Sequence, residues 1–245
     1  MAEAEAAGRE EIVGAEAPLH CARLKLCGAS LALDPAGALV WPEERLLVVA
    51  DLHFEKGSAA AVRGLFLPPY DTHLTLTVLE ALLARHRPER VIALGDSFHD
   101  GRGEARLSDV DRLRIRALTA ATDWTWIAGN HDPLPPADLG GRAAEEMAIG
   151  PLHFRHAPRP DAGEGEVSGH LHPAARVVAR GRSLRRRAFA CDGRRLILPA
   201  LGAYTGGLNV LDPAFRSLFP ERRFHAWMLG ETRVRPIRGA DLRPG

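Results

Sequence analysis

Three short apolar runs, each closed by a carboxylate or an amide, recur in the first half of the chain. They are LLVVAD (46–51), VIALGD (91–96) and WTWIAGN (124–130). Continuous apolar runs of this length are typical of strands buried on both faces of a sheet. Between them, residues 75–86 place leucines at helical spacing, and residues 107–121 show a similar pattern. The first half is therefore predicted to alternate strands and helices around a partly parallel sheet.

Shorter β-type segments precede and follow this region. Residues 19–41 predict two hairpin strands on either side of the turn sequence DPAG. In the second half, short apolar stretches broken by Gly and Pro show no long helical pattern, and they cover residues 152–156, 166–170, 176–180, 185–190 and 195–200. We expect these stretches to form a second, mostly antiparallel sheet.

The domain organisation follows from length and from the lack of a long linker. Residues 1–17 are polar and without apolar periodicity, which predicts a disordered tail. The acidic loop 158–166 is too short to separate two domains. With 245 residues in all, residues 18–245 are expected to form one α/β domain built on two sheets.

Composition argues against a membrane-spanning protein and against a secreted, disulfide-bonded one. The 46% hydrophobic and 26% charged residues are typical of a soluble globular protein. No apolar run approaches the roughly 20 residues of a membrane helix, and the acidic, Ala-rich N-terminus does not resemble a signal peptide. The cysteines form no CxxC pair and fit a reducing compartment, as ordinary core or surface residues (Cys21, Cys27 and Cys191). We therefore expect a cytoplasmic protein without membrane attachment.

The net charge of +1 conceals one basic segment. Between residues 176 and 195 the chain carries eight arginines against a single acid, Asp192. Such a segment is either a solvated strand face or a surface that attracts phosphates. The arginines alone do not decide between the two.

Candidate ligands follow the ends of the predicted strands. The carboxyl ends of parallel strands meet at one edge of a sheet, so Asp51, Asp96 and Asn130 should converge there. In the second half, SGHLHP places His170 and His172 one residue apart. In an extended segment, side chains at i and i+2 point the same way. This predicts that the two imidazoles face one place.

The joint set of side chains points to metal chemistry. Strand-end Asp or Asn residues commonly cap a following helix, which would explain any one of them alone. Together the oxygen and nitrogen ligands exceed the four positions of a structural zinc; they are Asp51, His53, Asp96, Asn130, His156, His170 and His172. With one bridging carboxylate, the set suits two ions such as Mn²⁺, Fe or Zn²⁺. Two metals about 3.5–4 Å apart are the usual clamp for displacement at phosphorus.

The motifs resemble those of calcineurin-like metallophosphoesterases in order and spacing. They are Asp51-x-His53, Gly95-Asp96, Gly129-Asn130-His131-Asp132 and Gly169-His170-x-His172. Four longer stretches are similar to the bacterial ligase-associated DNA damage response endonuclease branch, namely residues 51–57, 67–72, 94–100 and 198–210. The resemblance implies a four-layer α/β sandwich, with two mixed β-sheets flanked by helices.

The resemblance also implies roles for individual residues. Asp51, His53, Asp96 and His172 would hold the first metal, and Asp96 would bridge to a second metal completed by Asn130, His156 and His170. His131 would assist the leaving oxygen, oriented by Asp132. The implied metals are two divalent ions, manganese first, with iron or zinc as alternatives.

The function implied by the resemblance is metal-dependent phosphodiester hydrolysis. The substrate would be DNA, single-stranded DNA preferred, cut endonucleolytically in a repair setting with a functional link to a ligase and a helicase. The resemblance also implies a homodimer, to which the apolar segment 224–230 could contribute. The alternatives are a phosphatase or phosphodiesterase acting on small phosphorylated molecules, and a non-catalytic scaffold.

Two positions stay open. Many related phosphatases continue the second motif as GDxxDR, whereas here it runs Ser97, Phe98, His99, Asp100. The missing arginine argues against a protein phosphatase, and His99 either contacts substrate or supports the site. Tyr204 either stacks on a base or packs in the core.

Overall fold

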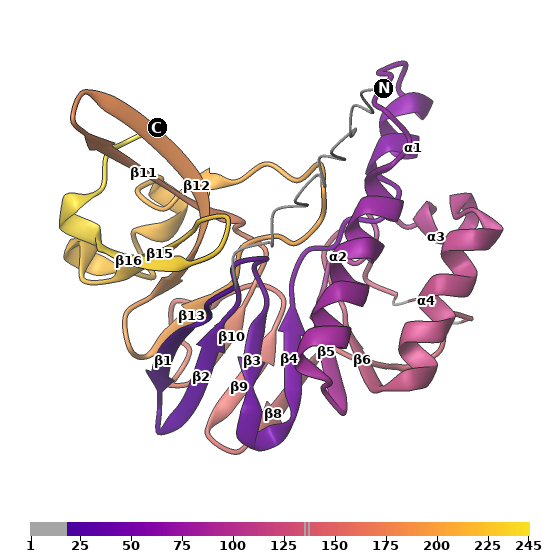
Figure 1. The fold of residues 1–245 in the computed structure, drawn as a ribbon, viewed down its shortest axis with the longest axis horizontal. Coiled ribbons are helices and arrows are strands. Elements are labelled where there is room, and N and C mark those ends of the chain that lie inside the picture. The colour runs from indigo at the N-terminus through magenta and orange to yellow at the C-terminus, as the bar shows by residue number, and fades with distance from the viewer. Residues whose placement is uncertain (1–18, 135, 137) are drawn as a thin grey trace, which may run out of the picture.

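The computed structural model describes residues 19–134, 136 and 138–245, and two β-sheets pack against each other in it (Figure 1). The first sheet has seven strands in chain order. Strands β1 to β4 pair antiparallel, and β4 to β7 pair parallel. Their bounds are β1 Ala22–Leu26, β2 Ala29–Leu33, β3 Leu39–Trp41, β4 Leu46–Val49, β5 Arg90–Leu94, β6 Asp123–Ile127 and β7 Arg142–Ala144.

The second sheet has nine strands, in the order β14-β11-β12-β13-β10-β9-β8, with β15 paired to β12 and β16 paired to β15. Antiparallel pairs are the majority, but β9, β10 and β13 pair parallel, as do β11 and β14. The bounds are β8 Glu146–Ile149, β9 Leu152–Arg155, β10 Glu166–Ser168, β11 Pro173–Ala179, β12 Arg182–Cys191, β13 Arg195–Ile197, β14 Leu208–Asn209, β15 His225–Leu229 and β16 Val234–Arg238.

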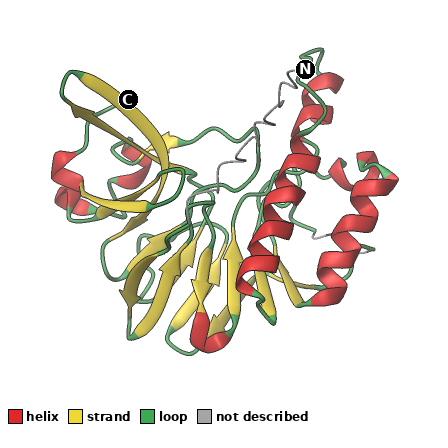
Figure 2. Cartoon of the chain, viewed as in Figure 1, coloured by secondary structure: helices red, strands yellow, loops and turns green. Residues whose placement is uncertain are grey.

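The helices lie on the outer face of the first sheet (Figure 2). They are α1 Lys56–Val62, α2 Asp71–His86, α3 Gly103–Arg106 and α4 Asp109–Ala121. Short 3₁₀ turns cover the outer face of the second sheet, where Phe215 and Phe219 pack with Ala188 and Ala190 of β12. The predicted fold class, two mixed sheets with flanking helices, is confirmed.

Alternation along β4 explains why its apolar run is continuous. Leu47 and Val49 face the helices, where they share a core with Leu76 and Leu79 of α2. Leu46 and Val48 face the other way, into the core between the two sheets. A strand with both faces covered has no place for a polar side chain until it ends. The first polar side chain after β4 is Asp51.

Several elements differ from the sequence-based expectation. The helix predicted over 75–86 begins at Asp71, and the one over 107–121 begins at Asp109, where Ser108 caps it by accepting from the Asp111 amide. Residues 22–41 form three strands rather than two. Helix α1 and strands β7, β8 and β16 were not predicted. The tail predicted over residues 1–17 lies outside the described residues.

The segment 224–230 is not a free apolar surface. It forms β15, which lies between β12 and β16, and Ala226, Met228 and Leu229 are buried. Its apolar side chains are therefore largely used within the chain itself, with Trp227 half-buried. The homodimer, and a contribution of this segment to it, stay predictions. Across the part of the chain that the structure describes, no helix has both the length and the apolar character needed to cross a membrane.

Candidate metal centre

The candidate ligands gather at the carboxyl ends of strands from both sheets. Parallel pairing of β4, β5 and β6 brings Asp51, Asp96 and Asn130 to one edge of the first sheet. His156 follows β9, and His170 follows β10, its parallel neighbour in the second sheet. The site therefore lies where the ends of the two sheets meet.

Three groups of potential ligand atoms form there, and two of them consist of predicted ligands. Asp51, His53 and His172 make one group, in which all the potential ligand atoms lie within 4.8 Å of one another. Asp96, His156 and His170 make the other. All seven predicted ligands are brought together, since the Asn130 Oδ1 lies 2.9 Å from the His156 Nε2.

Asp96 lies between the two groups. Its Oδ2 is 3.3 Å from the His156 Nε2 in one group and 3.9 Å from the His53 Nε2 in the other. His172 stays with the first group, its Nε2 3.3 Å from the Asp51 Oδ1. His170 stays with the second, its Nδ1 3.1 Å from the His156 Nε2.

The backbone at these ligands is left-handed. The φ angles are positive at Asp51 (52°), His53 (44°), Asp96 (47°), His170 (67°) and His172 (45°). Each such position costs a non-glycine residue on the order of 1–3 kcal/mol, and such positions cluster at functional sites. The extended backbone that we predicted for the HLH segment is therefore wrong. A turn, held by the His170 amide donating to the Asp51 carboxylate at 2.9 Å, sets the two imidazoles instead.

Glycines allow the ligand segments to approach one another closely. A Cβ on Gly169 would lie 2.5 Å from the Asp51 Oδ2, and one on Gly95 would lie 2.6 Å from the His156 ring. A Cβ on Gly129 would lie 2.1 Å from the Asp96 amide nitrogen. No side chain fits at these distances. The glycines in the motifs are thus required by packing around the ligands.

Protonation of the metal-free site follows from burial and pairing. Burial would lower the pKa of His156, but its hydrogen bond to Asp96 and the charge of Asp51 raise that pKa to about 9. Burial would raise the pKa of Asp96, but the same hydrogen bond and the nearby imidazoles lower it to about 2. Burial and the proximity of His172 lower the pKa of His53 to about 3.

These side chains fit divalent cations. The Nε2 atoms of His53 and His172 face each other at 3.3 Å. Only one hydrogen fits between them, so at least one of the two nitrogens presents a lone pair. The Asp51 carboxylate accepts from the His170 amide and the Asp96 carboxylate from the His131 amide, and each oxygen keeps a further lone pair that a cation can use. A divalent cation can accept the lone pairs of the facing imidazole nitrogens and those of the carboxylate oxygens, so it would give both kinds of group a partner.

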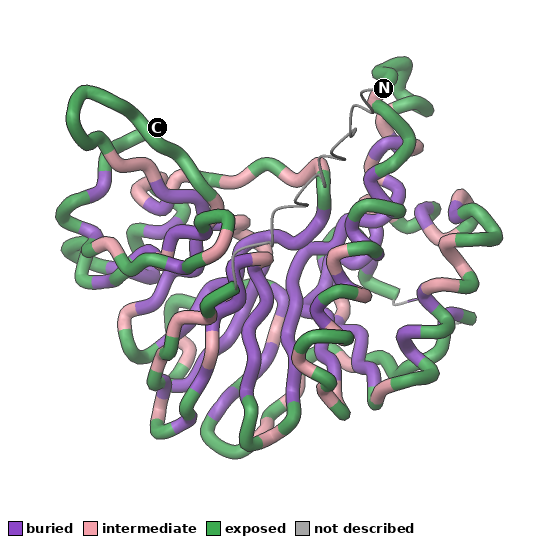
Figure 3. Tube along the Cα trace, viewed as in Figure 1, coloured by how far each residue is buried: buried purple, intermediate pink, exposed green. Residues whose placement is uncertain are grey.

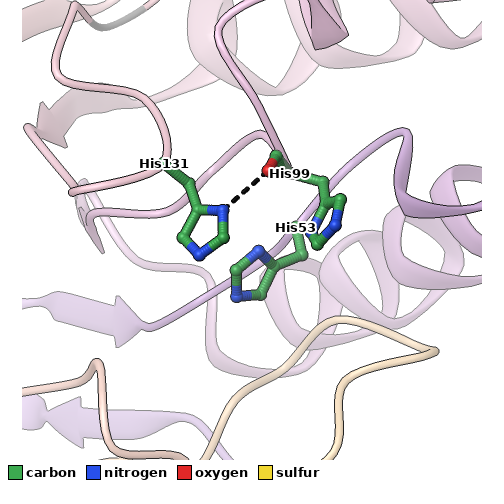
Figure 4. Close-up of side chains that lie close together, drawn as sticks. All are labelled: His53, His99 and His131. Atoms are coloured by element: carbon green, nitrogen blue, oxygen red, sulfur yellow. Dashed lines mark hydrogen bonds between the residues drawn. The ribbon is translucent and has the colours of Figure 1, made fainter. Parts of the chain in front are cut away.

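His131 and His99 lie beside His53 of the first group (Figure 4), and the potential ligand atoms of these three histidines lie within 4.8 Å of one another. The His131 Nδ1 lies 2.7 Å from the His99 carbonyl oxygen, and its backbone amide donates to the Asp96 Oδ1 at 2.9 Å. Its ring stacks on that of His99, with centroids 5.3 Å apart. Burial and the charge of Lys56 lower the pKa of His99, and Arg63 adds to the effect. The sequence left the place of His99 open; the structure puts it in the site.

Asp132 does not orient the His131 ring, and that prediction is wrong. Its Oδ2 accepts from the Phe98 amide at 3.0 Å, so it fixes the segment that follows Asp96. Burial raises the pKa of Asp132 to about 7, even though the Phe98 amide stabilises its charge. The carbonyl of His99 takes the orienting position instead, and sequence alone does not reveal a main-chain partner of this kind.

The basic segment lies beside the loop that borders the site. A Cβ on Gly207 would lie 2.6 Å from the His172 carbonyl, and the Arg185 guanidinium donates to the Gly207 carbonyl. Arg187 is partly buried and donates to the Ala200 carbonyl at 2.6 Å. The side chains of Arg185 and Arg187 line a depression of about 410 Å³ together with Thr205. Tyr204 of the same loop is half-buried.

Comparison with known proteins places the chain in a family. Residues 44–196 match the model of the calcineurin-like phosphoesterases. The chain belongs to that family. This phosphoesterase is similar in structure to the nuclease MPE of Pseudomonas putida, with 31% identity and a TM-score of 0.69 over 89% of this chain and 100% of that one. YfcE, a phosphoesterase of E. coli, matches with 13% identity and a TM-score of 0.39 over 79% of this chain and 98% of that one. A comparison with curated proteins finds no match.

Family membership identifies the ligand groups as candidate sites for divalent metals. A calcineurin-like phosphoesterase hydrolyses phosphoesters with divalent metals, and the candidate groups of this phosphoesterase lie inside the matched residues. The resemblance read from the motifs is confirmed at this level. The similarity to a nuclease agrees with the branch that the longer stretches indicated.

Proposed function

We propose that this phosphoesterase is a DNA endonuclease that cuts single-stranded DNA in repair and uses two divalent ions, manganese first. The observation that carries the proposal is the similarity to the Pseudomonas putida nuclease over 100% of that chain at 31% identity. The two ligand groups joined by Asp96 support a dinuclear centre.

The metals would be held by residues of both groups. Asp51, His53 and His172 would bind one ion and Asn130, His156 and His170 the other, with Asp96 shared. Divalent ions held by these residues would supply Lewis acidity toward a phosphate. Oxygen and nitrogen donors without cysteine suit manganese, while iron and zinc stay alternatives.

His131 would supply the proton for the leaving oxygen. The His99 carbonyl fixes the ring through Nδ1, at 2.7 Å, so Nε2 is the atom free to carry a proton to substrate. The bond from the His131 amide to Asp96 fixes the backbone beneath it. A group held in place by two contacts of this kind suits general acid catalysis.

The second motif favours a diester over a monoester. Where GDxxDR has arginine, Asp100 stands here, and its carboxylate pairs with Arg106 at 2.9 Å. A phosphomonoester carries close to two negative charges near neutral pH, and at this position the guanidinium that could grip it is replaced by an acid already paired with Arg106. A phosphodiester carries one charge and needs such a grip less.

The test is a nuclease assay on circular single-stranded DNA, which only an endonuclease can cut. The protein is stripped of metal and then given Mn²⁺, Mg²⁺ or Zn²⁺, with duplex DNA and an aryl phosphodiester in parallel and Asp96→Asn as the inactive control. We expect cutting of the circle, strongest with Mn²⁺. Hydrolysis of the aryl ester and of small nucleotides without any cutting of DNA would favour the small-molecule alternative.

A further inference from the structure

The segment from α1 to the start of α2 exposes an unusual run of apolar side chains. Phe66 is 86% exposed and Tyr70 60% exposed, and Val62 and Leu65 are exposed beside them. Single exposed apolar residues are common on soluble proteins, whereas a cluster marks an interaction surface. We call residues 62–70 the α1 platform.

Helix α1 connects the metal centre to the α1 platform. Phe54, which follows His53, accepts a hydrogen bond from the His99 amide at 3.0 Å, and α1 begins at Lys56. In Figure 1, α1 stands at the end of the first sheet where β4 and β5 finish, and Figure 3 shows much of this region exposed. The seven residues of α1 rise about 10 Å. That distance corresponds to about three nucleotides of a strand at about 3.4 Å each.

The α1 platform is anchored at its two ends. Before it, the Gly57 amide at the start of α1 donates to the Asp71 carboxylate at 3.0 Å, and the Glu55 amide donates to the Thr72 hydroxyl at 2.9 Å. The Arg106 guanidinium also donates to the Ser58 hydroxyl of α1 at 2.8 Å. Anchored ends restrict the freedom that the apolar side chains between them lose when a partner covers them.

The charge of the segment selects the partner. Residues 56–70 contain Lys56 and Arg63 and no acid. Positive charge beside exposed aromatic rings is the combination that binds an unpaired nucleic acid strand, because bases stack on the rings while the cations attract phosphates. A duplex offers no free base faces to these rings.

We propose that the α1 platform stacks unpaired bases of the DNA strand, through Phe66 and Tyr70, a few nucleotides from the phosphate that is cut. This inference rests on the proposed function. It gives that function a physical reason for choosing single strands, since only unpaired bases can reach the two rings. It assigns no role in the chemical step to either residue.

The test compares three variants of the full chain. Phe66→Ala combined with Tyr70→Ala removes both rings, and Phe66→Leu combined with Tyr70→Leu keeps apolar surface without rings. Leu113→Ala is the control, since Leu113 is 65% exposed on α4, outside the platform. Each variant is assayed for KM on a long oligothymidylate, on the same strand with abasic sites, and on an aryl phosphodiester.

Both ring-free variants should raise KM for the oligothymidylate by about 5- to 150-fold for each base that loses its stacking partner. The abasic strand, the aryl ester and Leu113→Ala should show no such change. If the wild type cuts the oligothymidylate and the ring-free variants keep its KM, the platform is refuted and the proposed function stands. If the wild type hydrolyses only the aryl ester, both fall. An altered oligomeric state with unchanged KM would assign the surface to a second copy of the chain and overturn the inference.

Discussion

His131→Ala offers the sharpest test of the catalytic assignment. The ring of His131 is 39% exposed and its Nε2 lies 4.0 Å from the Asp96 Oδ2, so it lies beside the predicted metal ligands. General acid catalysis contributes about 10²–10⁴ in rate, equal to about 2.7–5.4 kcal/mol of barrier. We expect a loss of this size on DNA, whose leaving alkoxide needs a proton.

The loss should shrink on an aryl phosphodiester, because an aryl leaving group departs with little protonation. The assay therefore compares kcat/KM for a single-stranded oligonucleotide and an aryl diester, in wild type and His131→Ala, at saturating Mn²⁺. Equal losses on the two substrates would refute proton donation and leave His131 a role in holding the phosphate.

The same variant should keep its fold and its metals. It loses one side-chain hydrogen bond, to the His99 carbonyl, worth about 0.5–1.5 kcal/mol. For a chain of this size that corresponds to a Tm shift of a few degrees. Metal analysis of the purified variant should find wild-type occupancy, and a loss of metal would show that the rate defect has another cause.

Other predictions follow from single contacts. Asp96→Asn should deplete both ions together, since its Oδ2 lies within 3.9 Å of His53 and 3.3 Å of His156; metal analysis that finds one ion kept would confine Asp96 to one group. Asp132→Ala should lower the free energy of unfolding by about 1–3 kcal/mol, because it leaves the Phe98 amide unpaired. Asp132→Asn keeps an acceptor for that amide and should be more stable than Asp132→Ala, so equal denaturation midpoints for the two variants would contradict this. Arg185→Gln should reduce the salt slope of single-strand binding by about 0.7, and Arg182→Gln, at the exposed start of β12, should not; equal slopes would make Arg185 part of a solvated strand face.

The strands and most ligands were predictable because their cause is local. Buried parallel strands need continuous apolar runs, and β4, β5 and β6 end close to the first polar side chain that follows each of them. Asp51, Asp96 and Asn130 were found in this way. The spacing of the histidines then identified a set of ligands, though not the conformation of the chain that carries them.

Other features were hidden because they depend on distant partners. The turn at His170 is held by Asp51, so the alternation rule gave the wrong backbone there. Strands β9, β10 and β13 pair parallel, but they are too short for their pattern of apolar and polar residues to distinguish parallel from antiparallel pairing. Helix α1 has few apolar residues to bury and is anchored instead through Asp71. In each case the deciding contact joins separate segments, which a local rule of periodicity cannot relate.

The hydrogen bond between His170 and Asp51 joins residues separated by 119 positions, one at the end of each sheet. The metal centre therefore cannot assemble until both sheets have folded and docked. Ions that bind only the docked state shift the folding equilibrium toward it. The equilibrium constant for folding rises with the ratio of the free ion concentration to the dissociation constant. Metal binding would thus stabilise the docked sheets, and chelation would lower the free energy needed to separate them. The cell's supply of divalent metal would then govern how long the protein survives, as well as how fast it works.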